Sequence, residues 1–139
     1  MSQENVEIVR ASIAAFNAGD MKAALVNVHP EVEWYTNAAA PDMGLFQGHD
    51  GLKKMAAMLE EVLGDVRMEA DEFLDGGDDV VVLGRLHVTG AGSGAATESY
   101  RAWVYTLREG EIVRHLTYTD RAQALDAAGL SEQDAHADS

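Results

Sequence analysis

The sequence predicts an α+β domain, in which three amphipathic helices pack on one face of a curved antiparallel sheet. Residues 2–63 carry apolar side chains at helical spacing, whereas residues 66–119 are rich in β-branched residues and short turn motifs. Helices followed by strands that are joined by tight turns are typical of this class. A strongly twisted sheet of this size can curl around helices and leave a pocket at its open end.

The first half of the chain is expected to form the helices. The first helix places apolar side chains on one face, at steps of three and four residues: Val6, Val9, Ile13 and Phe16. It ends before Gly19, Asp20 caps a second helix, and Pro30 stops that helix. A third helix begins at the cap residue Asp50 and ends before Gly64.

The second half is expected to form a meander of four strands: Val66–Asp71, Val80–Thr89, Glu98–Arg108 and Ile112–Thr119. The turns fall at Asp75–Asp78 and Glu109–Gly110, and the glycine-rich segment Gly90–Ala96 joins two strands. A short strand near Val32–Tyr35 links the helical half to the sheet, and a short helix at Arg121–Ala128 follows the last strand.

Length and charge narrow the possible partners. The 139 residues fit one domain, expected over residues 1–130, with an acidic tail at 131–139. The 24 acidic and 10 basic residues give a formal charge of −14. Such a surface repels phosphate backbones and anionic lipid, so neither nucleic acid nor a membrane is expected as a partner.

Composition also bears on the compartment and on the chemistry. The chain has no cysteine, which excludes disulfides, thiolate metal sites and a cysteine nucleophile. No apolar run approaches the roughly 20 residues that span a bilayer. The N-terminus lacks the basic-then-apolar order of a secretion signal, so we expect a cytoplasmic protein.

Apolar residues occur at both alternating positions of the predicted strands, as in the run Val80–Leu83 and the pair Trp103 and Val104. Both faces of the sheet are therefore expected to be buried. The simplest way to bury the second face is a homodimer through the sheet.

Several segments, in this order and spacing, resemble the SnoaL-like branch of the nuclear transport factor 2 superfamily: Phe16–Asp20, His29–Trp34, Phe46–Gly48, Leu107–Val113 and Tyr118–Asp120. That superfamily includes ketosteroid isomerases, polyketide cyclases and limonene-epoxide hydrolases. The resemblance implies a cone-shaped, cystatin-like α+β barrel wrapped around three N-terminal helices, usually dimeric, with a cavity for an apolar small molecule. The fold hosts both enzymes and non-enzymes.

The residues of the ketosteroid isomerases do not carry over. The resemblance places their oxyanion-hole tyrosine at Ser12, their base aspartate at Trp34 and their second aspartate at or near Trp103. An indole offers only a hydrogen-bond donor and cannot replace a carboxylate base. Steroid isomerisation by that mechanism is therefore not expected.

The epoxide hydrolase pattern fits better. Those enzymes have an Arg-x-Asp pair on a central strand and a second aspartate after the last strand, and this chain has Arg85-Leu86-His87 and Tyr118-Thr119-Asp120. If all three side chains face the cavity, Arg85 can hold Asp120 ionised for acid–base work, and His87 can donate a proton in the role that the related hydrolases give to a carboxylic acid. Two alternatives stay open: Asp120 caps the helix that begins at Arg121, and His87 is a hydrogen-bonded structural residue.

The aromatic residues are candidates for the walls of a substrate pocket, or for core filling: Trp34, Trp103, Tyr105 and Tyr118. Arg114 and His115 are adjacent on one strand, so only one of them can face inward. A metal site from His87, His115 and Asp120 is conceivable, but no metal and no cofactor are expected.

Together these observations predict a cytoplasmic homodimer that holds a small apolar molecule. The leading hypothesis is cofactor-free acid–base catalysis, by epoxide hydrolysis, isomerisation or cyclisation of a hydrophobic substrate. One alternative is a non-catalytic dimer that binds a small ligand, and another is a purely structural dimerisation domain.

Overall fold

The structure is a computed structural model, and it describes residues 2–38, 40, 44–90 and 95–131. The predicted tail at 131–139 lies outside these residues except for Ser131. The elements follow one another as α1 (Ser2–Asn17), α2 (Met21–Ala24), β1 (Val28–Tyr35), β2 (Leu45–Gln47), α3 (Gly48–Val62), β3 (Asp65–Gly76), β4 (Asp79–Thr89), β5 (Ala96–Arg108), β6 (Glu111–Tyr118) and α4 (Arg121–Ala127).

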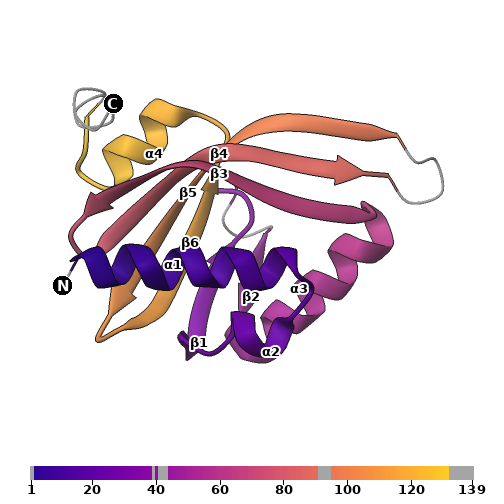
Figure 1. Ribbon diagram of the computed structural model, residues 1–139, viewed down its shortest axis with the longest axis horizontal. Helices are drawn as coiled ribbons and strands as arrows, with labels where there is room; N and C mark the ends of the chain where they lie inside the picture. Colours follow the sequence, from indigo (N-terminus) through magenta and orange to yellow (C-terminus); the bar gives the residue numbers. More distant parts are fainter. Residues whose placement is uncertain (1, 39, 41–43, 91–94, 132–139) are drawn as a thin grey trace.

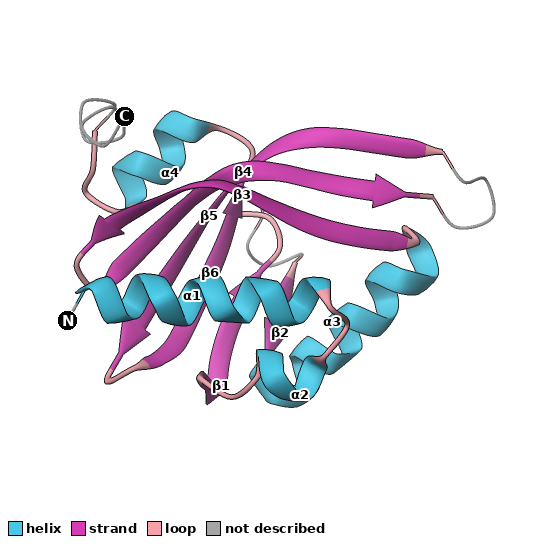
Figure 2. Ribbon diagram, in the orientation of Figure 1, coloured by secondary structure: helices cyan, strands magenta, loops and turns pink. Residues whose placement is uncertain are grey.

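The strands form one curved sheet with six strands in the order β2-β1-β6-β5-β4-β3. Neighbouring strands are antiparallel except β1 and β6, which are parallel. Helices α1, α2 and α3 lie on one side of the sheet, and α1 crosses in front of the strands (Figures 1 and 2). The α+β class is confirmed, with a curved sheet that does not close into a complete barrel.

Two apolar layers hold this arrangement together. On the inner face, α1, α2 and α3 pack against a cluster of sheet residues that includes Val80, Val82, Trp103, Tyr105 and Ile112. On the outer face, Ala124 and Leu125 of α4 pack against Leu74, Val81, Leu83, Ala102 and Val104. The apolar residues at both alternating positions are therefore partly explained within one chain, and the homodimer stays a prediction.

The second helix is much shorter than the sequence predicted. It ends at Ala24, and the chain enters β1 at Val28. Pro30 therefore lies inside a strand instead of stopping a helix. The pairing of β1 with β6 shifts its register between Val28 and Glu33, so the proline, which has no N–H to donate, falls in the irregular part of the ladder.

Two further differences concern β2 and the start of α3. Strand β2 was not predicted, and it forms by pairing with β1, where Phe46 lies opposite Trp34. Helix α3 begins at Gly48 after Gln47, so Asp50 lies in its first turn and does not cap it. A carboxylate in the first turn still interacts favourably with the helix dipole.

A β-bulge interrupts the pairing of β3 with β4 between Ala70 and Glu72. The backbone of β3 there comes very close to Gly84 of β4: a Cβ atom at this glycine would lie 1.9 Å from the carbonyl oxygen of Glu69. Only glycine fits this position, which ties the bulge to a single residue of the neighbouring strand.

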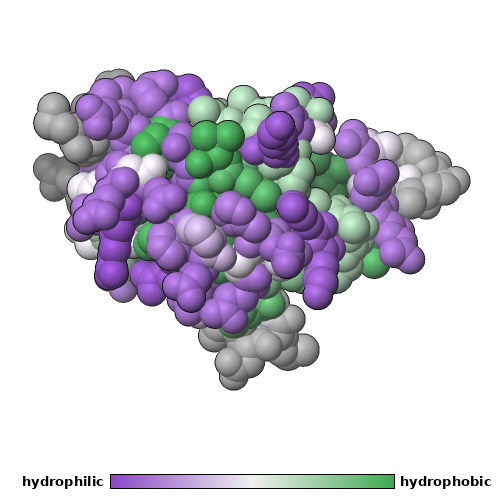
Figure 3. Space-filling model, turned by 90° about the horizontal axis from the view of Figure 1, so that it is seen from below, coloured by the Kyte–Doolittle hydropathy of each residue, from purple (hydrophilic) through white to green (hydrophobic). Residues whose placement is uncertain are grey.

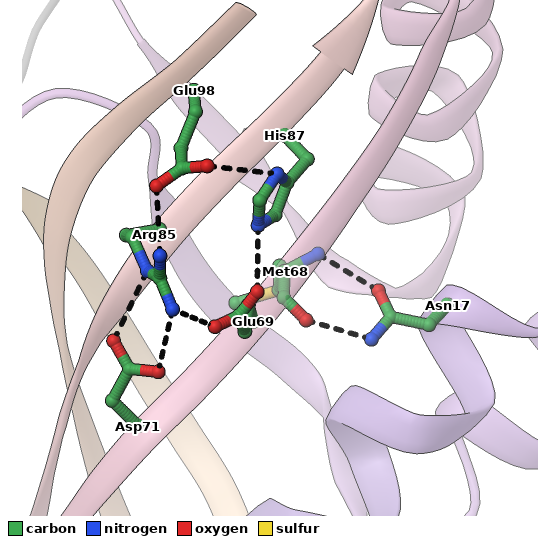
Figure 4. Close-up of polar contacts among 7 residues, drawn as sticks. All are labelled: Asn17, Met68, Glu69, Asp71, Arg85, His87 and Glu98. Carbon is green, nitrogen blue, oxygen red and sulfur yellow. Dashed lines mark hydrogen bonds and ion pairs between the residues drawn. The ribbon is translucent and has the colours of Figure 1, made fainter.

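The end of α1 is joined to β3 by one side chain. Asn17 donates from Nδ2 to the carbonyl oxygen of Met68 at 2.8 Å, and its Oδ1 accepts from the amide of Met68 at 2.9 Å (Figure 4). The amide side chain therefore bonds the strand as another strand would. This contact fixes the helix over the inner face of the sheet.

The surface carries both apolar and polar side chains. Figure 3 shows the face seen from below, where apolar side chains form a green area among purple polar ones. In the part of the chain that the structure describes, no helix has the length and apolarity needed to cross a membrane.

Candidate small-molecule site

A pocket of about 290 Å³ lies between the helices and the inner face of the sheet. Most of its lining is apolar. The helices contribute Ile13, Phe16, Met21, Leu52, Met55 and Leu59, and the sheet contributes Val66, Met68, Leu86, Trp34, Trp103 and Tyr105. Few polar side chains face it, namely Ser12, Thr36, Arg101, His115 and Thr117. No carboxylate belongs to the described residues that line the pocket.

Three aromatic rings form a row across adjacent strands on the floor of the pocket. His115 of β6 pairs in register with Trp34 of β1 and with Tyr105 of β5. The imidazole stacks on the indole of Trp34, with centroids 3.9 Å apart and planes at 5°, and meets the ring of Tyr105 edge-on at 4.7 Å. Cross-strand aromatic contacts of this kind hold the rings in fixed positions.

His115 is the buried polar residue of this row. It is 2% exposed, and neither ring nitrogen has a hydrogen-bond partner among the described residues. Burial lowers its pKa to about 3 against a smaller opposing effect of the nearby Tyr35 backbone, so the imidazole is neutral near pH 7. A neutral imidazole carries one N–H donor and one acceptor nitrogen, and neither is used by a described residue.

The structure does not bring together the three residues predicted to form the catalytic group. Along β4, Leu86 lines the pocket, while Arg85 and His87 lie on the outer face of the sheet. The catalytic hypothesis requires the side of β4 that carries Val81 and Leu83, and with them Arg85 and His87, to face inward. That side packs under α4 instead, so the placement of Arg85 and His87 is corrected.

Arg85 and His87 belong to a charged cluster on the outer face (Figure 4). Arg85 contacts Glu69, donates to Asp71 at 3.2 and 3.3 Å, and donates to Glu98 at 2.8 Å. Hydrogen bonds to Asp71 and Glu98 raise the pKa of Arg85 further above its ordinary value. His87 Nε2 lies 2.8 Å from Glu69. These ion pairs are partly exposed and tie β3, β4 and β5 together.

Asp120 and Tyr118 also lie outside the pocket lining. Asp120 is exposed and caps α4, accepting a hydrogen bond from the amide of Gln123 at 3.2 Å, which is the capping alternative considered above. Tyr118 packs against the outer apolar cluster beside Leu125. In contrast, the other three predicted wall residues, Trp34, Trp103 and Tyr105, line the pocket. Among the described residues, no group of three histidines and carboxylates is arranged to hold a metal ion.

Comparison with family models matched residues 9–115 to the SnoaL-like domain. The chain belongs to the SnoaL-like family. Its resemblance to the nuclear transport factor 2 superfamily is thereby confirmed, and the fold and family support a small-molecule binding or catalytic domain.

Solved structures of similar fold agree with this family assignment. The chain is 25% identical to an NTF2-like protein of unknown function from Burkholderia pseudomallei, over 88% of this chain and 95% of that one, with a TM-score of 0.75. It is 29% identical to TerC, which was co-crystallised with polyporic acid, over 91% and 98% of the two chains, with a TM-score of 0.76. A comparison with curated proteins found no match.

None of the residues at the positions that the resemblance assigned to the isomerase site is a carboxylate. The three positions to which the resemblance assigned the isomerase residues, Ser12, Trp34 and Trp103, all line the pocket. The polar residues that do face it include Arg101, for which the sequence suggested no role, and His115, which was weighed only as a conceivable metal ligand. Arg101, Trp103 and Tyr105 are each two residues apart along β5, so their side chains lie on the same face of the sheet. This spacing could have indicated that Arg101 faces the pocket together with the two aromatic residues. The choice between Arg114 and His115 needed the parallel pairing of β1 with β6.

Proposed function

We propose that the chain binds an apolar, ring-containing small molecule in the pocket between α1–α3 and the sheet. The observation that carries this proposal is a neutral, buried imidazole without a hydrogen-bond partner among the described residues, set in apolar walls. Ligand sites are typically apolar clefts with a few well-placed polar groups. An unsatisfied buried polar atom costs about 1–3 kcal/mol, a cost that a polar group on the ligand offsets.

A ligand titration tests the proposal. Trp34 and Trp103 line the pocket, so their fluorescence reports on a molecule bound there. A panel of naphthalene, 2-naphthol and 2-acetylnaphthalene is titrated into the protein and into His115→Phe. Phenylalanine keeps an aromatic ring beside Trp34 but has no nitrogen. We expect 2-naphthol and 2-acetylnaphthalene to bind the variant at least several-fold more weakly, with naphthalene unchanged. If none of the three compounds shows saturable binding, the proposal is contradicted.

Catalysis on the bound molecule is a second candidate function, favoured by the same imidazole. A neutral imidazole N–H can donate to a carbonyl oxygen and stabilise negative charge that develops on it. This chemistry assists isomerisation or cyclisation through an enol, in which a water molecule in the pocket takes the proton from the carbon beside the carbonyl. Epoxide hydrolysis by a carboxylate pair is less well supported, since the described pocket lining has no carboxylate.

Proton exchange tests the catalytic candidate. We incubate ketones that bind the pocket in deuterated water and follow deuterium incorporation beside the carbonyl by NMR. Incorporation well above the buffer rate, lost in His115→Phe, supports catalysis. Buffer-rate exchange for every bound ketone leaves the binding function and removes the catalytic one.

We also propose that the chain forms a homodimer through the part of the outer sheet face that α4 leaves uncovered. The charged cluster around Arg85 lies on that face, so such an interface would combine polar and apolar contacts. Light scattering at micromolar concentration should give twice the chain mass of 14.9 kDa. A mass of one chain overturns this assembly.

A further inference from the structure

Arg101 is a cation on the pocket wall without an acidic partner among the described residues. It lies on β5 on the inner face, two residues from Trp103, and both line the pocket. Its Nη1 donates to the backbone oxygen of its neighbour Tyr100 at 2.8 Å, and the described part of the chain offers it no ion pair. Arg85, on the opposite face of the sheet, contacts three carboxylates.

This contrast matters in an acidic chain. Carboxylates outnumber basic residues by 24 to 10, yet none of those in the described residues forms an ion pair with the partly buried Arg101. The residue opposite Arg101 on β4 is Gly84, and the backbone of β3, with the carbonyl oxygen of Glu69, fills the position where a side chain at Gly84 would begin. Apolar residues, among them Leu63, Val66 and Leu86, line the same pocket. In such surroundings of low polarity, a guanidinium attracts an anion more strongly than it does in water.

Spacing on the strand gives the size of the ligand. Residues two apart on one face of a strand are separated by roughly 6–7 Å. A ring packed on Trp103 can therefore reach Arg101 with an acidic group attached directly to that ring or through a short side chain. A planar guanidinium binds a carboxylate through two parallel hydrogen bonds, which also orients the ligand.

The rest of the positive charge near the pocket lies on the adjacent helices. Met21 and Leu25 line both the pocket and a neighbouring groove that is also lined by Lys22, Lys53 and His49. The three lysines of the chain, Lys22, Lys53 and Lys54, all lie on α2 and α3. Local positive charge at a cleft raises the concentration of anions there, even on a protein that is acidic as a whole.

We propose that the ligand of this pocket is an apolar acid. It is an aromatic or polycyclic molecule that carries a carboxylate, or an enol or phenol of comparable acidity, and Arg101 binds the anion. This inference deepens the proposed binding function and rests on it. It specifies the chemical class of the ligand and the residue that selects it.

Matched acids and amides test this inference separately from binding itself. Benzoate and benzamide, 2-naphthoate and 2-naphthamide, and anthracene-2-carboxylate and its carboxamide differ in charge but little in shape. Their affinities are measured by calorimetry for the wild type, Arg101→Gln and Arg108→Gln. Arg108 is exposed, lies on the same strand outside the pocket lining and gives the same change in net charge.

We expect the wild type to bind at least one acid roughly ten- to a hundredfold more tightly than its amide, the range of a charge-assisted hydrogen bond. Arg101→Gln should lose most of this preference through weaker acid binding, with amide binding unchanged. Arg108→Gln should keep it. Arg101→Lys, which keeps the charge but not the planar fork, should fall between the wild type and Arg101→Gln.

Four results overturn the inference. If acids and amides bind the wild type equally, or the preference survives in Arg101→Gln, Arg101 does not select an anion and the binding function stands. If Arg108→Gln loses the preference to the same extent, net charge explains it and a specific role for Arg101 is overturned. If no acid and no amide binds, the inference and the proposed function fail together.

Discussion

At the scale of single residues, the pocket combines two polar groups that a purely structural core would pair or exclude. His115 is buried with both ring nitrogens unpartnered among the described residues, and Arg101 faces the pocket without a carboxylate. Buried polar groups in folded proteins are nearly always hydrogen-bonded, so exceptions need an explanation. A bound molecule would supply the missing partners.

The first prediction concerns the stability of His115→Phe. If the imidazole is kept for a ligand, an apolar ring of similar shape should fit as well or better in the ligand-free protein. We expect the free energy of unfolding to stay equal or to rise by about 1 kcal/mol, because the variant removes unsatisfied polar atoms. Urea denaturation measures it. A loss of several kcal/mol would show that His115 has a structural partner.

The second prediction concerns pH. The pKa of His115 is about 3 in the folded chain, against about 6.5 in the unfolded chain. Between these values the unfolded state binds the proton and the folded state does not, so stability falls as pH drops from 6.5 towards 3. The contribution is up to about 1.4 kcal/mol per pH unit. The free energy of unfolding is measured as a function of pH for the wild type and for His115→Phe, and the difference between the two gives the contribution of His115. A difference that does not change with pH contradicts the burial of a neutral imidazole.

At the scale of elements, local pattern predicted most of the strands and failed where pairing between distant segments decides the structure. Strand β3 begins one residue before its predicted start at Val66, and the strand predicted from Val80 begins at Asp79. The extent of α2 was wrong, since pairing with β6 draws Val28 and Pro30 into β1. Propensity is a weak guide where such tertiary contacts compete.

The sequence also predicted one part of the candidate site and missed another. Trp34, Trp103 and Tyr105 could be proposed as wall residues from their aromatic character and the strand pattern, and they line the pocket. The inward face of β4 could not be inferred, because both alternating positions are apolar and α4 covers one of them. The condition that Arg85 and His87 face the cavity, on which the catalytic hypothesis depended, therefore does not hold.

The third prediction tests the bulge that shapes β3 and β4. A methyl group at Gly84 would overlap the carbonyl oxygen of Glu69, so Gly84→Ala must displace the strand backbone. We expect a loss of about 1–3 kcal/mol, typical of overpacking in a tightly packed region. Ser99→Ala, at an exposed position on neighbouring β5, is the control and should change little. If the unfolding curves of the two variants coincide, the close approach of the Glu69 carbonyl oxygen to Gly84 is contradicted.

At the scale of the whole molecule, the two faces of the sheet have different roles. The inner face and the helices enclose an apolar pocket, whereas the outer face carries the cluster around Arg85 and the packing of α4 (Figures 1 and 4). Because side chains alternate along a strand, one sheet can support both arrangements without shared residues. We therefore expect substitutions of Arg85 to affect the stability or the assembly of the protein and to leave ligand binding intact.

The central claim is that a small molecule binds on the inner face. The most direct measurement is a crystal structure of the protein with the tightest-binding naphthalene or anthracene derivative from the titrations. The account predicts the rings between α1–α3 and the sheet, in contact with Trp34 and Trp103, and a polar group within hydrogen-bond distance of His115 or Arg101. A ligand bound on the outer face beside Arg85 or α4, with an unoccupied inner pocket, would contradict it.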